Sequence, residues 1–293
     1  MPRVNANDIE IEYETFGNLE DKPLLLIIGL GSQMIGWEEG FIKSLTDRGF
    51  FVIIFDNRDV GLSSKIDEAG DPDLMGAFTA VQQGKDFKTP YTLEDMADDA
   101  IGLLDALNIE KAHICGASMG GMIAQTVAIK HPSRVLSLTS IMSTTGNPEL
   151  PQMSQEAAQV LFNPVPPERE AYIENLVRVG KYTYGSGFPF NEEKVRSFAA
   201  RVFDRCYYPQ GAERQTLAVM VDGNRKDRLS DIKVPTLIIH GREDPFFPIE
   251  GGIDTHEAIS GSELLIIEGM GHSLPPETWP QIAESIAKNA AKA

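Results

Sequence analysis

The strongest chemical signal in the chain is the segment Gly-Ala-Ser-Met-Gly at 116–120. This Gly-x-Ser-x-Gly pattern follows an apolar, strand-like run and leads into a helix-like stretch. In that context the chain turns sharply from strand to helix, which strains the serine backbone and exposes its hydroxyl to a neighbouring base. Gly116 and Gly120 permit the turn, because a Cβ at either position would collide with the crossing strand and helix. A chance match is the alternative, but the flanking strand and helix favour Ser118 as a catalytic nucleophile.

Two downstream segments can supply the partners of an activated serine, an imidazole that accepts its proton and a carboxylate that orients the imidazole. Asp244 lies in His-Gly-Arg-Glu-Asp-Pro, after the apolar run 234–239. His272 lies in Gly-Met-Gly-His-Ser, after the apolar run 264–267. Loops that follow parallel strands converge at one edge of the sheet although they are far apart in sequence. The three segments therefore predict a catalytic triad of Ser118, Asp244 and His272, in this chain order.

Strand-like and helix-like segments alternate along the chain and would carry these loops. Residues 9–16 alternate apolar and polar side chains, as in a half-buried antiparallel edge strand. Short apolar runs, typical of buried parallel strands, occur at 24–28, 51–55, 112–115, 135–141, 236–239 and 264–267. Helical patterns occur at 38–47, 93–107, 122–130, 251–259 and 277–292. The alternation predicts an α/β protein whose parallel sheet is covered on both faces.

Two segments interrupt the alternation. Residues 145–226 open with a Pro-rich stretch and contain three helical patterns. We expect them to form a helical cap over the pocket, inserted between core strands, so that residues 1–144 and 227–293 form the core. Residues 67–91 are long for an unstructured connection, and we expect a short element there at the rim of the pocket.

The chain resembles the α/β-hydrolase superfamily over nearly its whole length, in particular the group of carboxylesterases, proline iminopeptidases and cofactor-free haloperoxidases. It is most similar to the aclacinomycin methylesterase type, through Asp-Asn-Arg-Asp-Val-Gly-Leu-Ser at 56–63, Gly-Ala-Ser-Met-Gly-Gly at 116–121 and His-Gly-Arg-Glu-Asp-Pro at 240–245. This resemblance implies the α/β-hydrolase fold, a mostly parallel eight-stranded sheet flanked by helices, with an inserted helical cap. It also implies chemistry that needs no cofactor.

The resemblance further implies an oxyanion hole made of two backbone N–H groups. Many relatives carry His-Gly after the third strand, and the residue after that glycine is one donor; here the strand ends in Ile-Gly-Leu-Gly at 28–31. Leu30 is the expected donor, with Gly31 as the alternative. The other donor is Met119, at a helix N-terminus that favours negative charge. A second departure is Asp59, where relatives of this type often have glycine; we expect a local change of the turn and no catalytic role.

Apolar residues on the predicted pocket-side loops and the cap could together form an acyl or alcohol pocket. With the loop glycines, the expected pocket residues are Gly29, Gly31, Met34, Trp37, Phe188, Phe190, Phe246 and Met270.

Other chemically active residues have structural interpretations. Cys115 belongs to a buried strand and is interpreted as an inert thiol. His240 and Asp244 have the spacing of metal ligands, but no further His or Cys cluster accompanies them, so we expect no metal site. Asp98 and Asp99 on a predicted helix are interpreted as a solvated face.

Composition agrees with a globular enzyme. The 293 residues are 42% hydrophobic, enough for one large core with an insertion. A formal charge of −17 argues against nucleic acid or an anionic membrane as partner. Two cysteines are too few for a disulfide framework, and the opening residues lack an apolar signal core. We therefore expect a cytoplasmic monomer or homodimer whose partner is a small-molecule ester, without membrane insertion, cofactor or metal.

These observations predict a serine hydrolase that cleaves a carboxylic ester of a small apolar molecule through an acyl-enzyme. Perhydrolase or haloperoxidase-like chemistry on the same triad is one alternative. An aminopeptidase is another, and it would need acidic groups in the cap to bind the substrate amine. A ligand-binding receptor that retains the triad is the alternative from a different class.

Overall fold

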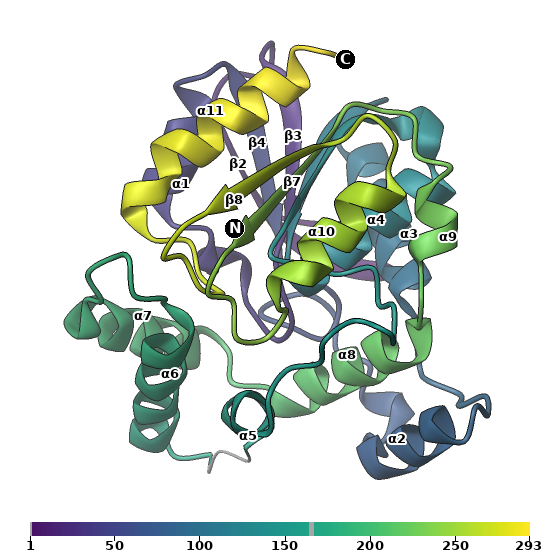
Figure 1. The fold of residues 1–293 in the computed structure, drawn as a ribbon, viewed down its shortest axis with the longest axis vertical. Coiled ribbons are helices and arrows are strands. Elements are labelled where there is room, and N and C mark those ends of the chain that lie inside the picture. The colour runs from purple at the N-terminus through teal and green to yellow at the C-terminus, as the bar shows by residue number, and fades with distance from the viewer. Residues whose placement is uncertain (1, 164–166) are drawn as a thin grey trace.

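The structure, a computed structural model, describes residues 2–163 and 167–293 and is built around an eight-stranded sheet with helices on both faces (Figure 1). The strands follow the order β1-β2-β4-β3-β5-β6-β7-β8. β2 pairs antiparallel with β1 and β4, and the remaining neighbours pair parallel. The expected α/β-hydrolase fold is confirmed. The strands are β1 (Arg3–Ala6), β2 (Ile9–Phe16), β3 (Lys22–Ile27), β4 (Phe50–Phe55), β5 (Ala112–Ala117), β6 (Val135–Ile141), β7 (Thr236–Gly241) and β8 (Glu263–Ile267).

Two groups of helices cover the faces of this sheet. One face carries α3 (Leu93–Ala106), α4 (Met119–Lys130) and α10 (Ile249–Ala258), and the other carries α1 (Glu39–Thr46) and α11 (Trp279–Ala290). The short helical turns are η1 (Met34–Gly36), η2 (Asp67–Ala69), η3 (Pro132–Arg134), η4 (Pro276–Thr278) and α9 (Lys226–Leu229). No helix within residues 2–163 and 167–293 is long and apolar enough to span a membrane.

Capping residues set the ends of these helices. Thr92 and Asp95 form a reciprocal capping box at the start of α3. Helix α4 begins at Met119, three residues before the predicted start, because Ser118 already occupies its N-cap position. The helix therefore starts at the residue after the serine, and its free N–H groups lie beside the serine side chain.

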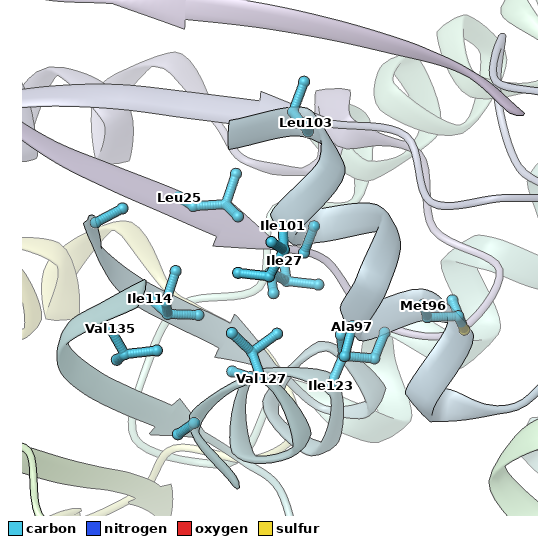
Figure 2. Close-up of a cluster of buried hydrophobic side chains, with 14 of the residues drawn as sticks. Leu25, Ile27, Met96, Ala97, Ile101, Leu103, Ile114, Ile123, Val127 and Val135 are labelled. Atoms are coloured by element: carbon cyan, nitrogen blue, oxygen red, sulfur yellow. The ribbon is translucent and has the colours of Figure 1, made fainter. Parts of the chain in front are cut away.

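The larger hydrophobic core lies between the sheet and helices α3 and α4 (Figure 2). Leu25 and Ile27 of β3 and Ile114 of β5 contribute the sheet side of this core. Ile123 and Val127 of α4 lie one helical turn apart and are fully buried against them. Since the core holds β5 and α4 together, it fixes the turn between them that carries Ser118.

Among the described residues, four long helices and the short α9 lie between β6 and β7 in the chain, and the four long ones lie beyond one end of the sheet, below it in the view of Figure 1. They are α5 (Gln155–Phe162), α6 (Arg169–Thr183), α7 (Glu192–Arg205) and α8 (Pro209–Asp222), and we call them the cap. The sequence had indicated three of them. Residues 164–166 of the expected insertion 145–226 lie outside the described residues.

Buried ion pairs attach the loop after β4 to its surroundings. Asp59 has a φ of 69° and is fully buried. Its carboxylate accepts hydrogen bonds from Arg214 of α8 at 2.8 and 3.1 Å, so this position anchors the cap. Asp99 is buried too and binds Arg58 at 2.6 Å through both oxygens, which corrects its interpretation as part of a solvated face. Asp98 does lie near the surface, where it binds Lys130.

The segment 67–91 contains η2 and a helix, α2 (Leu74–Gln82). Helix α2 packs against α8 on the outside of the cap. None of these residues lines the cavity described below, so the expected position at its rim is corrected. The length of the segment was the reason for that expectation, but Met75 of α2 is 74% exposed and does not line the cavity.

His113 of β5 predicts a pH dependence of stability. Its Nδ1 lies 2.8 Å from the Ser137 hydroxyl, and burial lowers the pKa of His113 from 6.5 to about 4, with the charge of Lys22 acting in the same direction. The unfolded chain takes up a proton near pH 6.5 that folded His113 accepts only near pH 4. Acid therefore favours unfolding, and stability present above pH 6.5 is lost as the pH falls towards 4.

We expect this residue to lower the free energy of unfolding by about 2 kcal/mol between pH 7 and pH 5. Urea unfolding of the wild type and of His113→Gln at both pH values measures the effect. The glutamine retains a polar group for Ser137 but does not titrate, so the variant should lose correspondingly less stability on acidification. An equal loss in both proteins would contradict this account.

Candidate active site

Ser118 occupies a strained turn between β5 and α4. Its φ is 57° and its ψ is −123°, a conformation that residues with a side chain rarely adopt. A Cβ on Gly116 would lie 1.9 Å from the carbonyl oxygen of Gly120, and one on Gly120 would lie 2.0 Å from that of Ile27. The sequence therefore needs both glycines for the close crossing of strand and helix that projects the serine hydroxyl from the sheet edge.

Ser118, His272 and Asp244 come together at this edge. His272 Nε2 lies 3.0 Å from the Ser118 hydroxyl, and His272 Nδ1 lies 2.7 Å from Asp244 Oδ2. Asp244 Oδ1 accepts hydrogen bonds from the backbone N–H groups of Phe246 and Phe247, both at 2.9 Å. The carboxylate is thus held in one orientation, with one oxygen left for the imidazole.

A second histidine supports the acid loop. His240 is fully buried at the end of β7, and its Nε2 lies 2.8 Å from the Phe247 carbonyl oxygen and 3.5 Å from Asp244 Oδ2. Burial lowers the pKa of His240, so it is neutral and donates Nε2–H to the carbonyl. The sequence showed His240 four residues before Asp244, but only the fold reveals that it holds the loop of the acid.

Residues 28–31, which contain the expected donor Leu30 and are here called the oxyanion loop, lie directly beside Ser118. A Cβ on Gly29 would lie 3.1 Å from Cβ of Ser118. The N–H of Gly31 donates to Oε1 of Gln215 at 2.8 Å and is therefore engaged. The N–H groups of Leu30 and Met119 have no hydrogen-bond partner among the residues that the structure describes.

A cavity of about 810 Å³ lies between the cap and the sheet edge, with Ser118 and His272 in its wall. Four of the expected pocket residues line it: Gly29, Gly31, Trp37 and Phe246. Its other apolar side chains come mostly from the cap and the loops beneath it. They include Leu30, Phe41, Met119, Met122, Met142, Met153, Leu161, Leu176, Val179, Val195, Phe198, Val219, Met220, Phe247 and Trp279.

The other four expected pocket residues do not line the cavity, which corrects that part of the prediction. Met34 and Met270 are fully buried in the hydrophobic cluster beneath α1 and α11. The N–H of Met34 donates to Asp56 Oδ1 at 2.7 Å, which holds this residue inside. Phe188 packs against the same cluster, and Phe190 packs edge-on against Tyr184, with ring centres 5.3 Å apart.

The segment 184–190 instead supports the loop that carries His272. Gly187 N–H donates to the Gly269 carbonyl at 2.9 Å, and Gly271 N–H donates to the Tyr184 carbonyl at 3.2 Å. A Cβ on Gly185 would lie 2.2 Å from the Gly269 oxygen. Glycines on both sides allow this backbone contact. Of the aromatic residues in this segment, Tyr184 lines the cavity, whereas Phe188 and Phe190 pack outside it.

Cys115 lies inside the sheet, as its apolar setting predicted. It is fully buried in β5, and burial raises the pKa of its thiol. A thiol of this kind is not a nucleophile at neutral pH, because the thiolate is the reactive form.

Comparison with known proteins gives the family. The family model described as alpha/beta hydrolase fold matches residues 22–277, and the chain belongs to this family. Among solved structures, a variant of the meta-cleavage product hydrolase CumD is similar, with a TM-score of 0.75 and 21% identity over 100% of this chain and 98% of that chain. At this identity the similarity shows the fold.

Some of the curated relatives are named as methylesterases or lactonases. Rhodomycin D methylesterase DauP of Streptomyces sp. (strain C5) is 26% identical over 309 residues, covering 97% of this chain and 95% of the relative. The 3-oxoadipate enol-lactonase 2 of Acinetobacter baylyi is 25% identical over 290 residues, covering 97% of this chain and 96% of the relative. Both names denote carboxylic ester hydrolases, the enzyme class expected from the sequence.

Proposed function

We propose that the chain is a serine hydrolase that cleaves a carboxylic ester of an apolar molecule. The observation that carries the proposal is the hydrogen-bonded relay from Asp244 through His272 to Ser118, whose hydroxyl lies at the wall of the cavity. A strained serine beside a correctly oriented imidazole is the arrangement that acyl transfer requires.

Each group has a role in the proposed reaction. His272 Nε2 removes the Ser118 proton as the hydroxyl oxygen attacks the ester carbonyl. The resulting tetrahedral oxyanion accepts hydrogen bonds from the backbone N–H groups of Leu30 and Met119. His272 then gives its proton to the alkoxide, which leaves as the alcohol. Water, activated by the same imidazole, attacks the acyl-enzyme and releases the acid. Asp244 fixes the tautomer and stabilises the imidazolium.

The cavity supports a bulky apolar substrate. About 810 Å³ is near the upper end of ordinary ligand sites, and most of its lining is aliphatic, aromatic or methionine. The name of the DauP relative, a methylesterase, agrees with a small leaving alcohol. We therefore propose methyl or other short-chain esters of bulky apolar acids as the substrate class.

The charges around the cavity argue against an aminopeptidase. Glu38 is the carboxylate among the described lining residues, and Lys194 of α7 pairs with it. A substrate ammonium would therefore find no free acidic partner in this cavity, although such a substrate needs one when it is desolvated.

A panel of esters tests the proposal. We expect kcat/KM for methyl esters to rise as the acyl part grows from acetate to a phenylbutyrate or naphthoate, because apolar area is buried at about 25 cal/mol per Å². Amino-acid p-nitroanilides and peroxide-dependent bromination of monochlorodimedone are the comparison reactions. Bromination or anilide cleavage faster than every ester, or the absence of ester turnover, would refute the proposed function.

A further inference from the structure

Gln215, on helix α8 of the cap, makes contact with the oxyanion loop. Its Oε1 accepts the N–H of Gly31 at 2.8 Å, and its Nε2 donates to the carbonyl oxygen of Arg58 at 2.9 Å. The Gln215 side chain is fully buried. One amide group of the cap therefore connects the loop beside the nucleophile with the loop after β4.

The oxyanion loop has little intrinsic rigidity. Leu30 is flanked by Gly29 and Gly31, and Gly31 has a φ of 62°, so the backbone on both sides of the donor has few steric restraints. Within the loop, Ser32 N–H closes a turn on the Gly29 carbonyl at 3.2 Å. The bond to Gln215 holds the Leu30–Gly31 peptide, which adjoins the peptide unit that carries the Leu30 N–H.

Gln215 is itself held in place by its neighbours on α8. Arg214, the preceding residue, forms the buried ion pair with Asp59. A Cβ on Gly211 would lie 1.9 Å from the Asp59 carbonyl oxygen, and one on Gly31 would lie 2.9 Å from Cβ of Ala212. Helix α8 thus sits directly on both loops, and the amide of Gln215 has a fixed position relative to Ser118.

We propose that Gln215 is a positioning residue for the oxyanion hole: by engaging the Gly31 N–H, the cap holds the Leu30 N–H towards the oxyanion. This inference rests on the proposed function. Thr216, Val219 and Met220 of the same helix line the cavity. Helix α8, which contacts the substrate, therefore also positions the Leu30 N–H that stabilises the oxyanion. A substrate that displaces α8 would lower the rate of its own hydrolysis.

The variant Gln215→Met tests the role, because methionine has a similar length and makes neither hydrogen bond. We expect kcat for p-nitrophenyl butyrate to fall about 10- to 100-fold, less than the loss of a whole oxyanion donor, with KM within about twofold. Phenylethyl trifluoromethyl ketone is a second readout. Ser118 adds to its carbonyl, and the resulting oxyanion occupies the hole, so its inhibition constant should rise by the same factor as kcat falls.

Gln125→Met is the matched control. Gln125 is a fully buried glutamine of α4 with two side-chain partners, Ser140 Oγ at 3.1 Å and Arg225 Nε at 3.2 Å. Gln125→Met should lower Tm by about as much as Gln215→Met does, while kcat and the ketone inhibition constant stay within about twofold of wild type. If Gln215→Met does not fold, Gln215→Asn is the second variant, because it withdraws the amide by one methylene group. It should lower kcat and raise the ketone inhibition constant together, by a smaller factor.

The outcomes separate the two proposals. A lower Tm for the Gln215 variants with unchanged kcat and inhibition constant would leave Gln215 a structural residue only and overturn the inference. A rise in KM alone, or a fall in kcat without weaker ketone binding, would overturn it too. Failure of the proposed function has a different signature: either the wild-type enzyme shows no ester turnover, or Ser118→Ala retains it, whatever the Gln215 variants do.

Discussion

Replacement of Ser118 by alanine should lower kcat for ester hydrolysis by about five to six orders of magnitude, because the acyl group then has no oxygen to bind. The fold should survive. Alanine has the same Cβ at the strained φ, and the backbone N–H of residue 118 still donates to the Ile141 carbonyl. Steady-state kinetics and circular dichroism measure the two effects. Labelling by a small fluorophosphonate should disappear together with turnover.

Cys115 provides the comparison, because it lies only three residues from the nucleophile. Cys115→Ala should cost about 1–3 kcal/mol of stability through a lost buried contact, with kcat within a few-fold of wild type. Mass spectrometry of wild-type enzyme trapped with a slowly hydrolysed ester should locate the acyl group on the Ser118 hydroxyl. Acylation on the Cys115 sulfur, or a fully active Ser118→Ala, would refute the mechanism.

Asp244→Asn should lower kcat by about four orders of magnitude. Asp244 Oδ2 accepts the His272 Nδ1 proton, and Oδ1 accepts two backbone N–H groups. An asparagine NH₂ directed at His272 forces the imidazole into the tautomer whose Nε2 carries the proton and cannot receive that of Ser118. The other amide orientation places NH₂ against two backbone donors. Neither orientation restores the wild-type relay.

Glu243→Gln is the matched control for this variant, since Glu243 directly precedes Asp244 and its carboxylate binds Ser186 at the surface. We expect its kcat within about threefold of wild type. The kcat values of Asp244→Asn and Glu243→Gln, with phosphonate labelling of Ser118 as a second readout, test this prediction. A near-wild-type Asp244→Asn enzyme would mean that another carboxylate orients His272.

The catalytic groups could be predicted from sequence because each is encoded locally. Ser118 is marked by its two glycines, and Asp244 and His272 each follow a short apolar strand. Parallel strands then bring their loops to one edge whatever the details of packing. The same logic gave seven of the eight strands, all but β1, and most of the helices that cover the sheet; it missed the start of α4 by only the three residues nearest Ser118.

The cavity wall could not be predicted in the same way, because it depends on contacts between distant segments. Gly31 and Gln215 are 184 residues apart, and nothing local to either one indicates their hydrogen bond. Composition suggested Phe188 and Phe190 as pocket residues, yet both pack elsewhere. A helical periodicity did carry the better signal: Tyr172, Leu176, Val179 and Thr183 of α6 recur at intervals of three or four residues, and all line the cavity.

The glycine contact between cap residues 185–187 and the histidine loop 269–271 bears on how such an enzyme can be re-engineered. In a chimaera whose cap carries side chains at positions 185 and 187, the new Cβ groups would lie 2.2 and 2.7 Å from the loop of His272. The cap is therefore not an exchangeable module. Substrate specificity can be transferred only when the cap and the histidine loop 269–271 are exchanged together.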